Sequence, residues 1–168
     1  MRDLGPEGAP LVEAAFVLTA DWNPANAKGE AFWRADPTFA QYTGGWGRPG
    51  DGGFVAEEDG RVVGAVWWRL FTAEDAGYGF VDEQTPEIGI AVWPGARGRG
   101  IGRLLLRAAT AAHPRLSLSV EDGNGARALY EAEGFVAVGR SGDGTIMLRT
   151  WEDAESSSRL MPEPGAAS

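Results

Sequence analysis

A glycine-rich turn between a strand-like and a helix-like segment constrains this chain more than any other feature. The turn reads Arg97-Gly98-Arg99-Gly100-Ile101-Gly102; it follows the apolar run 88–92 and opens a helical run over 103–112. Glycine lets the backbone approach a ligand closely, and the free N–H groups at a helix start point outward with the positive end of the helix dipole. The segment therefore predicts a site for an anionic, phosphate-bearing ligand.

Composition excludes several kinds of active site. The 168 residues include no cysteine and one histidine, His113, so disulfides, thiolate zinc sites and cysteine nucleophiles are excluded, and no metal is expected. The net charge of −9 argues against a nucleic-acid partner, and no window approaches the roughly 18 apolar residues of a membrane span. The N-terminus does not resemble a signal peptide, so we expect a cytoplasmic protein. We also expect one domain over 1–151 and a disordered acidic tail over 152–168.

Hydrophobic periodicity predicts alternating helices and strands. A Glu58-Asp59-Gly60 turn indicates a β-hairpin, and a strand on each side of the helix at 103–112 indicates a parallel crossover. The expected helices cover 10–20, 25–33, 103–112 and 124–133, with a turn near 38–42, and the expected strands cover 54–57, 61–68, 87–92, 116–120, 135–139 and 145–149. These elements predict an α/β (α+β) fold with a mixed, mostly antiparallel central sheet, one β-α-β crossover and flanking helices.

Two familiar phosphate-binding motifs fit the turn poorly. A P-loop needs a Lys-Ser/Thr pair where this chain has Ile101-Gly102, so it would lack both the phosphate lysine and the magnesium hydroxyl. A dinucleotide site needs its glycines directly after the strand and a repeated β-α-β series. Glu121 could mimic the ribose carboxylate of such a site, but five residues separate the strand from Gly98 and no such series follows.

Two stretches of the chain resemble the GNAT acetyltransferase superfamily. Residues 86–105 resemble its core motif, (Gln/Arg)-x-x-Gly-x-(Gly/Ala), which Arg97, Gly100 and Gly102 fill. Residues 120–135 match the family pattern Asn-x-x-Ala/Arg-x-Leu-Tyr-Glu-x-x-Gly-Phe. The two motifs occur in the family's order with a suitable gap. The resemblance covers about 54–150 and implies a single acetyltransferase domain over 1–151.

The resemblance implies acetyl-CoA as co-substrate. Backbone N–H groups of 98–103 would hold the pyrophosphate, and the strand over 87–92 would bond the pantetheine arm where the sheet splays. The side chains of the turn's arginines could instead face solvent, and Asn124 has two candidate jobs, helix N-cap and hydrogen bond to pantetheine. The implied cofactor-binding residues are Ile90, Ala91, Val92, Arg97, Gly98, Arg99, Gly100, Ile101, Gly102, Arg103 and Asn124.

Strand parity places a carboxylate beside two small residues, because Glu87, Gly89 and Ala91 share one face. The resemblance implies that Glu87 is the general base, directly or through water, and that Tyr130 protonates the departing thiolate. The expected activity is direct transfer of an acetyl group from acetyl-CoA to an amine. The alternative is a non-catalytic acyl-CoA-binding sensor of the same fold.

The acceptor stays open between a small amine and a peptide amine, and a homodimer is also left open. Aromatic residues lie in the segments that form the acceptor side in related folds, with an acidic group nearby that could attract a cationic amine. Because adjacent strand residues face opposite ways, we expect at most one of Trp67 and Trp68 on the core side. The aromatic residues are Trp22, Trp33, Tyr42, Trp46, Trp67 and Trp68, and the acidic ones are Glu74, Asp75, Asp82 and Glu83.

Overall fold

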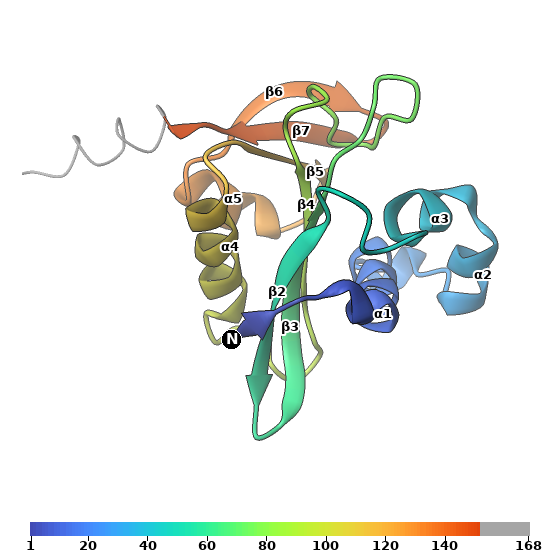
Figure 1. Ribbon diagram of the computed structural model, residues 1–168, viewed down its shortest axis with the longest axis vertical. Helices are drawn as coiled ribbons and strands as arrows, with labels where there is room; N and C mark the ends of the chain where they lie inside the picture. The colour runs from blue at the N-terminus through green and yellow to red at the C-terminus, as the bar shows by residue number, and fades with distance from the viewer. Residues whose placement is uncertain (152–168) are drawn as a thin grey trace, which may run out of the picture.

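A seven-stranded mixed sheet organises the computed structural model, which describes residues 1–151 (Figure 1). Its strand order is β1-β2-β3-β4-β5-β7-β6, and every neighbouring pair is antiparallel except β4 and β5. The strands are β1 (Arg2–Asp3), β2 (Gly52–Glu58), β3 (Arg61–Arg69), β4 (Glu87–Val92), β5 (Leu116–Glu121), β6 (Val136–Ser141) and β7 (Gly144–Arg149). The predicted fold class, with its single parallel crossover, is confirmed. The tail expected to be disordered, 152–168, lies outside the described residues.

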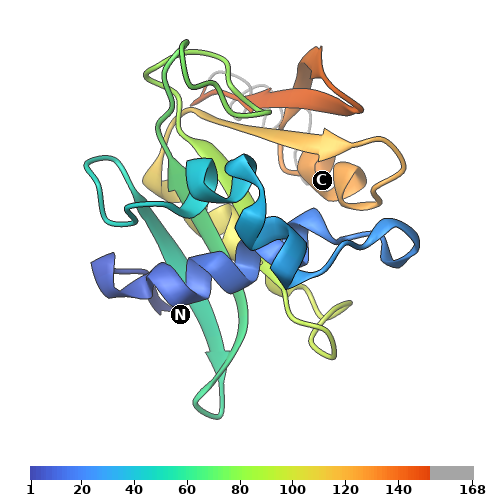
Figure 2. The ribbon, with the colours of Figure 1, turned by 90° about the vertical axis from the view of Figure 1, so that its right-hand side faces the viewer.

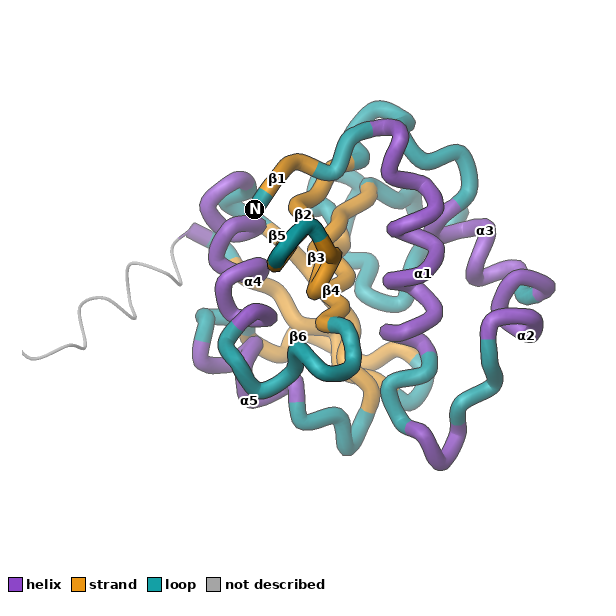
Figure 3. Tube along the Cα trace, turned by 90° about the horizontal axis from the view of Figure 1, so that it is seen from below, coloured by secondary structure: helices purple, strands orange, loops and turns teal. Residues whose placement is uncertain are grey.

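Helices cover both faces of the sheet. Seen from below, α4 and α5 lie on one side of the strands and α1, α2 and α3 on the other (Figure 3). Short 3₁₀ turns at Pro6–Gly8 and Pro24–Asn26 precede α1 and α2. The helices are α1 (Ala9–Ala20), α2 (Glu30–Ala35), α3 (Pro37–Thr43), α4 (Ile101–Ala112) and α5 (Ala126–Ala132). Within residues 1–151 no helix combines the length and the apolar character needed to cross a bilayer.

Two hydrophobic cores result, one on each face. The core under α4 includes Trp68, Ile88 and Leu105, and the core under α1 includes Phe16, Trp67 and Ala91. Trp67 and Trp68 do point to opposite faces, but both are buried. The expectation that at most one of them reaches a core was wrong, because helices cover both sides of the sheet.

The parallel strands β4 and β5 diverge after a single registered pair. Glu87 lies opposite Ser117, and the ladder goes no further, whereas β4 pairs with β3 along its whole length. Figure 2 shows α1 crossing the strands on this side, and α1 packs against β4. Beyond Glu87, one edge of β4 therefore has backbone groups that no strand within residues 1–151 satisfies.

Local differences from the expected elements have local causes. The helical region expected over 25–33 divides, because the Asn23 side chain accepts a hydrogen bond from the Ala25 N–H and caps a short 3₁₀ turn. Gly29, at φ 84°, then precedes α2. Strand β1 was not expected, since its two residues carry no periodicity and are held by pairing with β2.

Candidate functional site

The N-terminus of α4 is open, as the glycine pattern predicts. Gly98 and Gly100 adopt left-handed conformations, φ 73° and 82°, which strain residues with a Cβ atom. The helix's first internal bond runs from the Leu104 N–H to the Gly100 carbonyl, at 3.1 Å. The N–H groups of residues 101–103 consequently have no carbonyl partner within α4 and point out of its end. This end of the helix has the geometry of an anion site.

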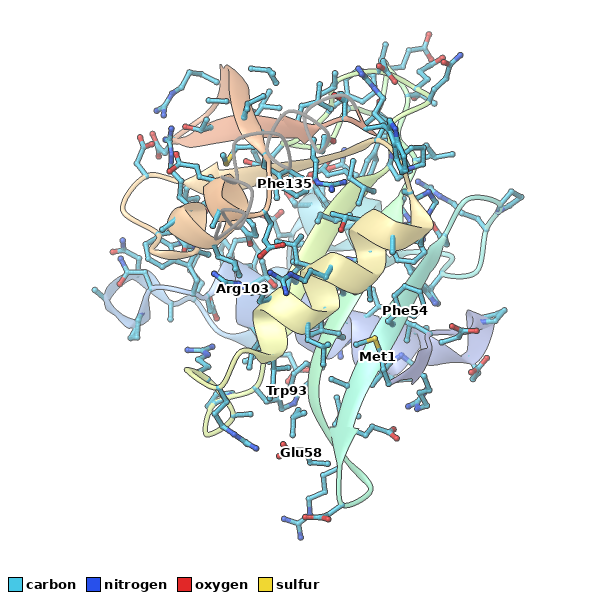
Figure 4. The ribbon with its side chains drawn as sticks, turned by 90° about the vertical axis from the view of Figure 1, so that its left-hand side faces the viewer. Met1, Phe54, Glu58, Trp93, Arg103 and Phe135 are labelled. Carbon is cyan, nitrogen blue, oxygen red and sulfur yellow. The ribbon has the colours of Figure 1, made fainter. Side chains whose placement is uncertain are left out.

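A groove of about 560 Å³ begins at this helix end and follows the gap beside β4. Every residue expected to bind the cofactor lines it, except Arg99. Arg99 forms an ion pair with Glu58 at the tip of the β2–β3 hairpin (Figure 4). Arg103 lies on the outer side of α4 and pairs with Glu133 at 3.1 Å. The residues that line the groove beyond those expected are Leu18, Thr19, Trp22, Ala96, Ala126, Leu129 and Tyr130.

Alternation along β4 decides which of its backbone groups face the gap. The Trp93 N–H donates to the Val63 carbonyl at 2.9 Å, and Ala91 pairs with Ala65 of β3. In such an antiparallel ladder the N–H and C=O of Ala91 point toward β3, whereas those of Ile90 and Val92 point into the gap. Ala91 therefore offers the groove its small side chain, and not the backbone contact expected from the sequence.

Two side chains already reach the carbonyls that face the gap. The Val92 carbonyl accepts from Arg97 Nε at 3.1 Å, and the Ile90 carbonyl accepts from Thr19 Oγ1 at 3.4 Å. Arg97 thus bonds to the backbone of β4, although its residue as a whole remains exposed.

A second cavity, of about 370 Å³, lies on the α1 side of the sheet. Four residues line both this cavity and the groove: Thr19, Trp22, Asn124 and Tyr130. Thr19 and Trp22 lie at and just beyond the end of α1, whereas Asn124 precedes α5 and Tyr130 belongs to it, so the two hollows meet between these helices. Tyr130 stands at that junction, where a group bound in one hollow would contact a group bound in the other.

Glu87 lies in the wall of the second cavity and is only 6 % exposed. Its Oε1 accepts two hydrogen bonds, from the Tyr42 hydroxyl at 2.6 Å and from the Gly79 N–H at 3.0 Å. Its Oε2 is buried with no hydrogen-bond partner among the described residues. Burial raises the pKa of Glu87 to about 7, although both hydrogen bonds act to lower that pKa. A carboxyl with one free oxygen and a pKa near neutrality is suited to accept a proton.

Sequence reasoning did not find the residues that hold Glu87. The Tyr42 hydroxyl also accepts from the Tyr78 N–H at 2.7 Å, which fixes the loop before β4 against the carboxyl. Gly77 is part of the same arrangement, since a Cβ there would lie 2.2 Å from Glu87 Oε2. A Gly-Tyr-Gly loop carries no recognisable pattern, so only the folded chain reveals this contact.

Tyr130, in the second half of α5, and Asn124, just before that helix, lie at the junction. Tyr130 is partly buried, its ring packs near Phe135, and burial raises its pKa to about 12. The hydroxyl therefore stays protonated at neutral pH. The Asn124 side chain accepts from the Ala126 N–H at 3.0 Å, but the N-cap position of α5 is Gly125, one residue later than expected.

The acceptor-side aromatics are only partly gathered. Trp22, Trp33, Tyr42 and Trp67 line the second cavity; Trp46 and Trp68 do not. Trp46 instead donates to the Gly5 carbonyl at 3.0 Å, and Trp68 packs against His113 on the α4 face.

The acidic group expected near the acceptor lies elsewhere. Glu74, Asp75, Asp82 and Glu83 do not line the cavity, and Asp82 is paired with Arg115 at 3.1 Å. Glu121 and Asp143 line it in their place. Parity along β5 offered a signal for Glu121, since Ser117, Ser119 and Glu121 alternate with the core residues Leu116, Leu118 and Val120.

Comparisons with known proteins identify the family and the fold. A family model described as an acetyltransferase (GNAT) domain matches residues 49–137. The chain is 26 % identical to a ribosomal-protein-alanine N-acetyltransferase from Brucella melitensis, with TM-score 0.58 and coverage of 89 % of this chain and 98 % of that one. A comparison with curated protein sequences finds no match.

Two further similar structures contain coenzyme A or acetyl-CoA. Because their sequence identity to this chain is low, the likeness shows a shared fold alone. A putative acetyltransferase from Salmonella typhimurium, solved with acetyl-CoA, is 20 % identical with TM-score 0.56, covering 99 % of this chain and 97 % of that one. An N-acetyltransferase from Thermoplasma acidophilum, solved with coenzyme A, is 15 % identical with TM-score 0.59, and the match covers 89 % of this chain and 99 % of that one. The family match spans more than half of the chain, and this protein belongs to the GNAT acetyltransferase family.

Proposed function

We propose that this protein transfers the acetyl group of acetyl-CoA directly to the nitrogen of an amine, without an acyl-enzyme. One observation carries the proposal: a groove that ends at an open helix N-terminus meets a second cavity that contains a buried carboxyl, and Tyr130 lies at the junction. This arrangement provides separate places for a phosphate-bearing donor and for an acceptor, with an acid and a base between them.

The groove supplies donors where acetyl-CoA needs them. The N–H groups of residues 101–103 face the pyrophosphate position, and Arg97 and Arg103 add positive charge there. The N–H groups of Ile90 and Val92 face the gap and can donate to the pantetheine amides and to the thioester carbonyl. These residues bind and orient the donor, so that positioning and backbone polarisation provide most of the rate enhancement.

Glu87 accepts and Tyr130 donates a proton during the transfer. An amine enters as its ammonium form, with a pKa of about 10, and Glu87 Oε2 accepts the proton that must leave before attack. The C–N bond then forms at the thioester carbon while the C–S bond breaks. Tyr130 donates its hydroxyl proton to the departing sulfur, the proton that the nitrogen still loses on becoming an amide restores the Tyr130 hydroxyl, and the proton on Glu87 passes to solvent.

A thiol-release assay with acetyl-CoA and a panel of amines tests the proposal. We expect turnover with at least one amine, and we expect Tyr130→Phe to lower kcat by about 10- to 100-fold with little change in acetyl-CoA affinity. The loss is modest for a general acid because a thiol has an ordinary pKa near 8.5 and leaves readily as thiolate.

Calorimetric titration with coenzyme A is the control for this assay. Binding of coenzyme A without turnover of any amine would favour the sensor alternative, and no binding at all would contradict the proposal. An equal loss of affinity and turnover in Tyr130→Phe would instead indicate that the tyrosine only packs.

The pH dependence of activity depends on Tyr42. For the wild type, kcat/KM should rise with pH through about 7 as Glu87 loses its proton. The Tyr42 hydroxyl stabilises the carboxylate, so its removal in Tyr42→Phe raises the pKa of Glu87 and moves this rise to higher pH, by about one unit for a charge-assisted bond. Kinetics between pH 5.5 and 9.5 with one acceptor, whose own titration cancels in the comparison, measure the shift.

Tyr78→Phe is the matched control, because only the backbone N–H of Tyr78 bonds to Tyr42. That variant removes a phenol from the same cavity and leaves both hydrogen bonds of Glu87 in place. The pH at which kcat/KM of Tyr78→Phe is half-maximal should stay near that of the wild type. An unchanged midpoint in Tyr42→Phe would show that Glu87 is not the titrating base.

A further inference from the structure

We infer that the acceptor is a compact primary amine with an apolar body and with no carboxylate beside its amino group. This inference deepens the proposed function and rests on it. It is drawn from the shape, the aromatic walls and the charge distribution of the second cavity. Together these favour simple amines over amino acids, which carry a carboxylate next to the amino group.

The walls of the cavity are largely aromatic. Rings from α1, α2, α3 and β3 surround the space next to Glu87, and several contact one another. The ring centroid of Phe16 lies 5.9 Å from that of Trp33 and 5.7 Å from that of Tyr42. The aromatic residues that line the cavity are Phe16, Trp22, Trp33, Tyr42, Trp67, Tyr78 and Tyr130. Such walls favour an apolar or ring-bearing body and also attract an ammonium group through their π faces.

The size of the cavity favours a compact ligand. Its volume of about 370 Å³ is near the lower end for small-molecule sites, about 300–1,000 Å³. Trp22 Nε1 donates to Glu121 Oε2 at 2.7 Å, and this bond joins the segment after α1 to the end of β5 in the cavity wall. A small amine fits a cavity of this size, whereas most of an extended peptide chain would lie outside it.

The charged residues that line the cavity are mainly acidic. Glu87, Glu121 and Asp143 line the cavity, and Arg69 is the only cationic residue among the described residues that do. Arg69 is largely committed to the protein: it is 1 % exposed, four of its five N–H groups are used, and two of these donate to the carboxylate oxygens of Asp51, at 2.9 and 2.7 Å. Its remaining contacts are with the carbonyls of Gln41 and Gly44.

The neighbouring groove has the opposite character, since Arg97 and Arg103 line it. Cations thus serve the phosphate-bearing donor, and carboxylates serve the acceptor. Glu87 lines the cavity and its buried Oε2 has no hydrogen-bond partner among the described residues, so the carboxylate can pair with an ammonium bound beside it. A carboxylate on the adjacent carbon would lie near Glu87 with no cation to pair with, and such a contact is strongly unfavourable.

A matched trio of acceptors tests the inference: phenethylamine, phenylalaninamide and phenylalanine, each with saturating acetyl-CoA. The amide and the amino acid have nearly the same shape, and phenethylamine, whose amino group is at least as basic as that of phenylalanine, separates the effect of the carboxylate charge from that of amine basicity. We expect kcat/KM for phenethylamine and for phenylalaninamide to exceed that for phenylalanine by about 100-fold or more. A peptide beginning with alanine, added as a fourth acceptor, tests compactness, and we expect it to react more slowly than phenylalaninamide.

Two outcomes would overturn the inference while leaving acetyl transfer intact. One is phenylalanine reacting within tenfold of its amide, and the other is the peptide reacting faster than both small amines. Calorimetry of the trio with coenzyme A-loaded protein covers the case in which no acceptor turns over. Binding of the amide but not of phenylalanine would then preserve the charge selection although the proposed activity fails, and equal binding or no binding of both would overturn it.

Discussion

Glu87→Gln is expected to lower the rate of acetyl transfer by about 10²- to 10⁴-fold, the range for loss of a general base. Glutamine keeps the shape of the side chain and an oxygen that can accept from Tyr42 and Gly79, but it cannot take a proton. Because Glu87 lies in the acceptor cavity and does not line the cofactor groove, the affinity for acetyl-CoA should stay within about twofold. Steady-state kinetics and calorimetry measure the two effects separately.

The same substitution should change how stability depends on pH. The folded state raises the pKa of Glu87 from 4.5 to about 7, so between these values the folded protein binds more protons than the unfolded chain. The free energy of unfolding of the wild type therefore falls as pH rises through this window, by up to about 3 kcal/mol from this group. Glutamine does not ionise, so the Tm of Glu87→Gln should be higher than that of the wild type at pH 8 and close to it at pH 5.

Thermal melts of both proteins at the two pH values test this expectation. An equal difference in Tm at pH 5 and pH 8 would show that Glu87 is not buried with a raised pKa. Full activity of Glu87→Gln would remove it from the proposed mechanism, and activity lost together with acetyl-CoA binding would point to a structural defect.

Asp51→Asn is expected to destabilise the protein by about 3–5 kcal/mol, because it leaves Arg69 as a buried charge without a counter-ion. Both side chains of this pair are 1 % exposed. Asp51 Oδ2 also accepts from the backbone N–H groups of Gly47 and Arg48, so the pair fixes the loop before β2 to the end of β3. For a domain of this size the expected fall in Tm is roughly 10 °C or more.

Glu131→Gln is the control for this prediction. Glu131 forms an exposed ion pair with Arg127 one helical turn away, and such a pair contributes about 0.5 kcal/mol or less. Denaturant unfolding of both variants compares a buried pair with an exposed one. A loss below about 1 kcal/mol in Asp51→Asn would mean that the loop relaxes and lets water reach the guanidinium.

The buried pair also connects stability with the proposed function. Arg69 donates to the carbonyl of Gln41, the residue before Tyr42, and Tyr42 holds Glu87. A partly folded Asp51→Asn protein should therefore lose activity through misplacement of Tyr42 even where acetyl-CoA still binds. This effect separates the anchoring role of the pair from any contact with substrate.

Local features of the site could be predicted from the sequence because they depend on neighbours in the chain. Gly98 and Gly100 adopt the left-handed conformations that open the end of α4, and Asp59 and Gly60 form the expected hairpin turn with φ 50° and 74°. Parity along β4 correctly placed Glu87 on the face opposite Ile88, which lies in the α4 core. A turn, a helix start and strand alternation each involve only a few consecutive residues.

Contacts between distant segments could not be predicted in the same way. The sequence placed acidic residues of the loop before β4 near the acceptor, whereas the cavity takes Glu121 and Asp143 from the far end of the sheet. It also gave no order for the last strands, and β7 lies between β5 and β6. A single sequence does not encode which segments meet, because that choice depends on how all the layers pack together.

By itself, then, the sequence determined the fold class, the family and an anion site at the start of one helix, since local backbone preferences and two short motifs specify them. Tertiary structure alone decided what surrounds the proposed base. Tyr42 reaches Glu87 across 45 positions, and Trp22 reaches Glu121 across 99. These contacts exist because α1 packs on β4 and α3 packs on α1, and the same packing removes Glu87 from water and raises its pKa.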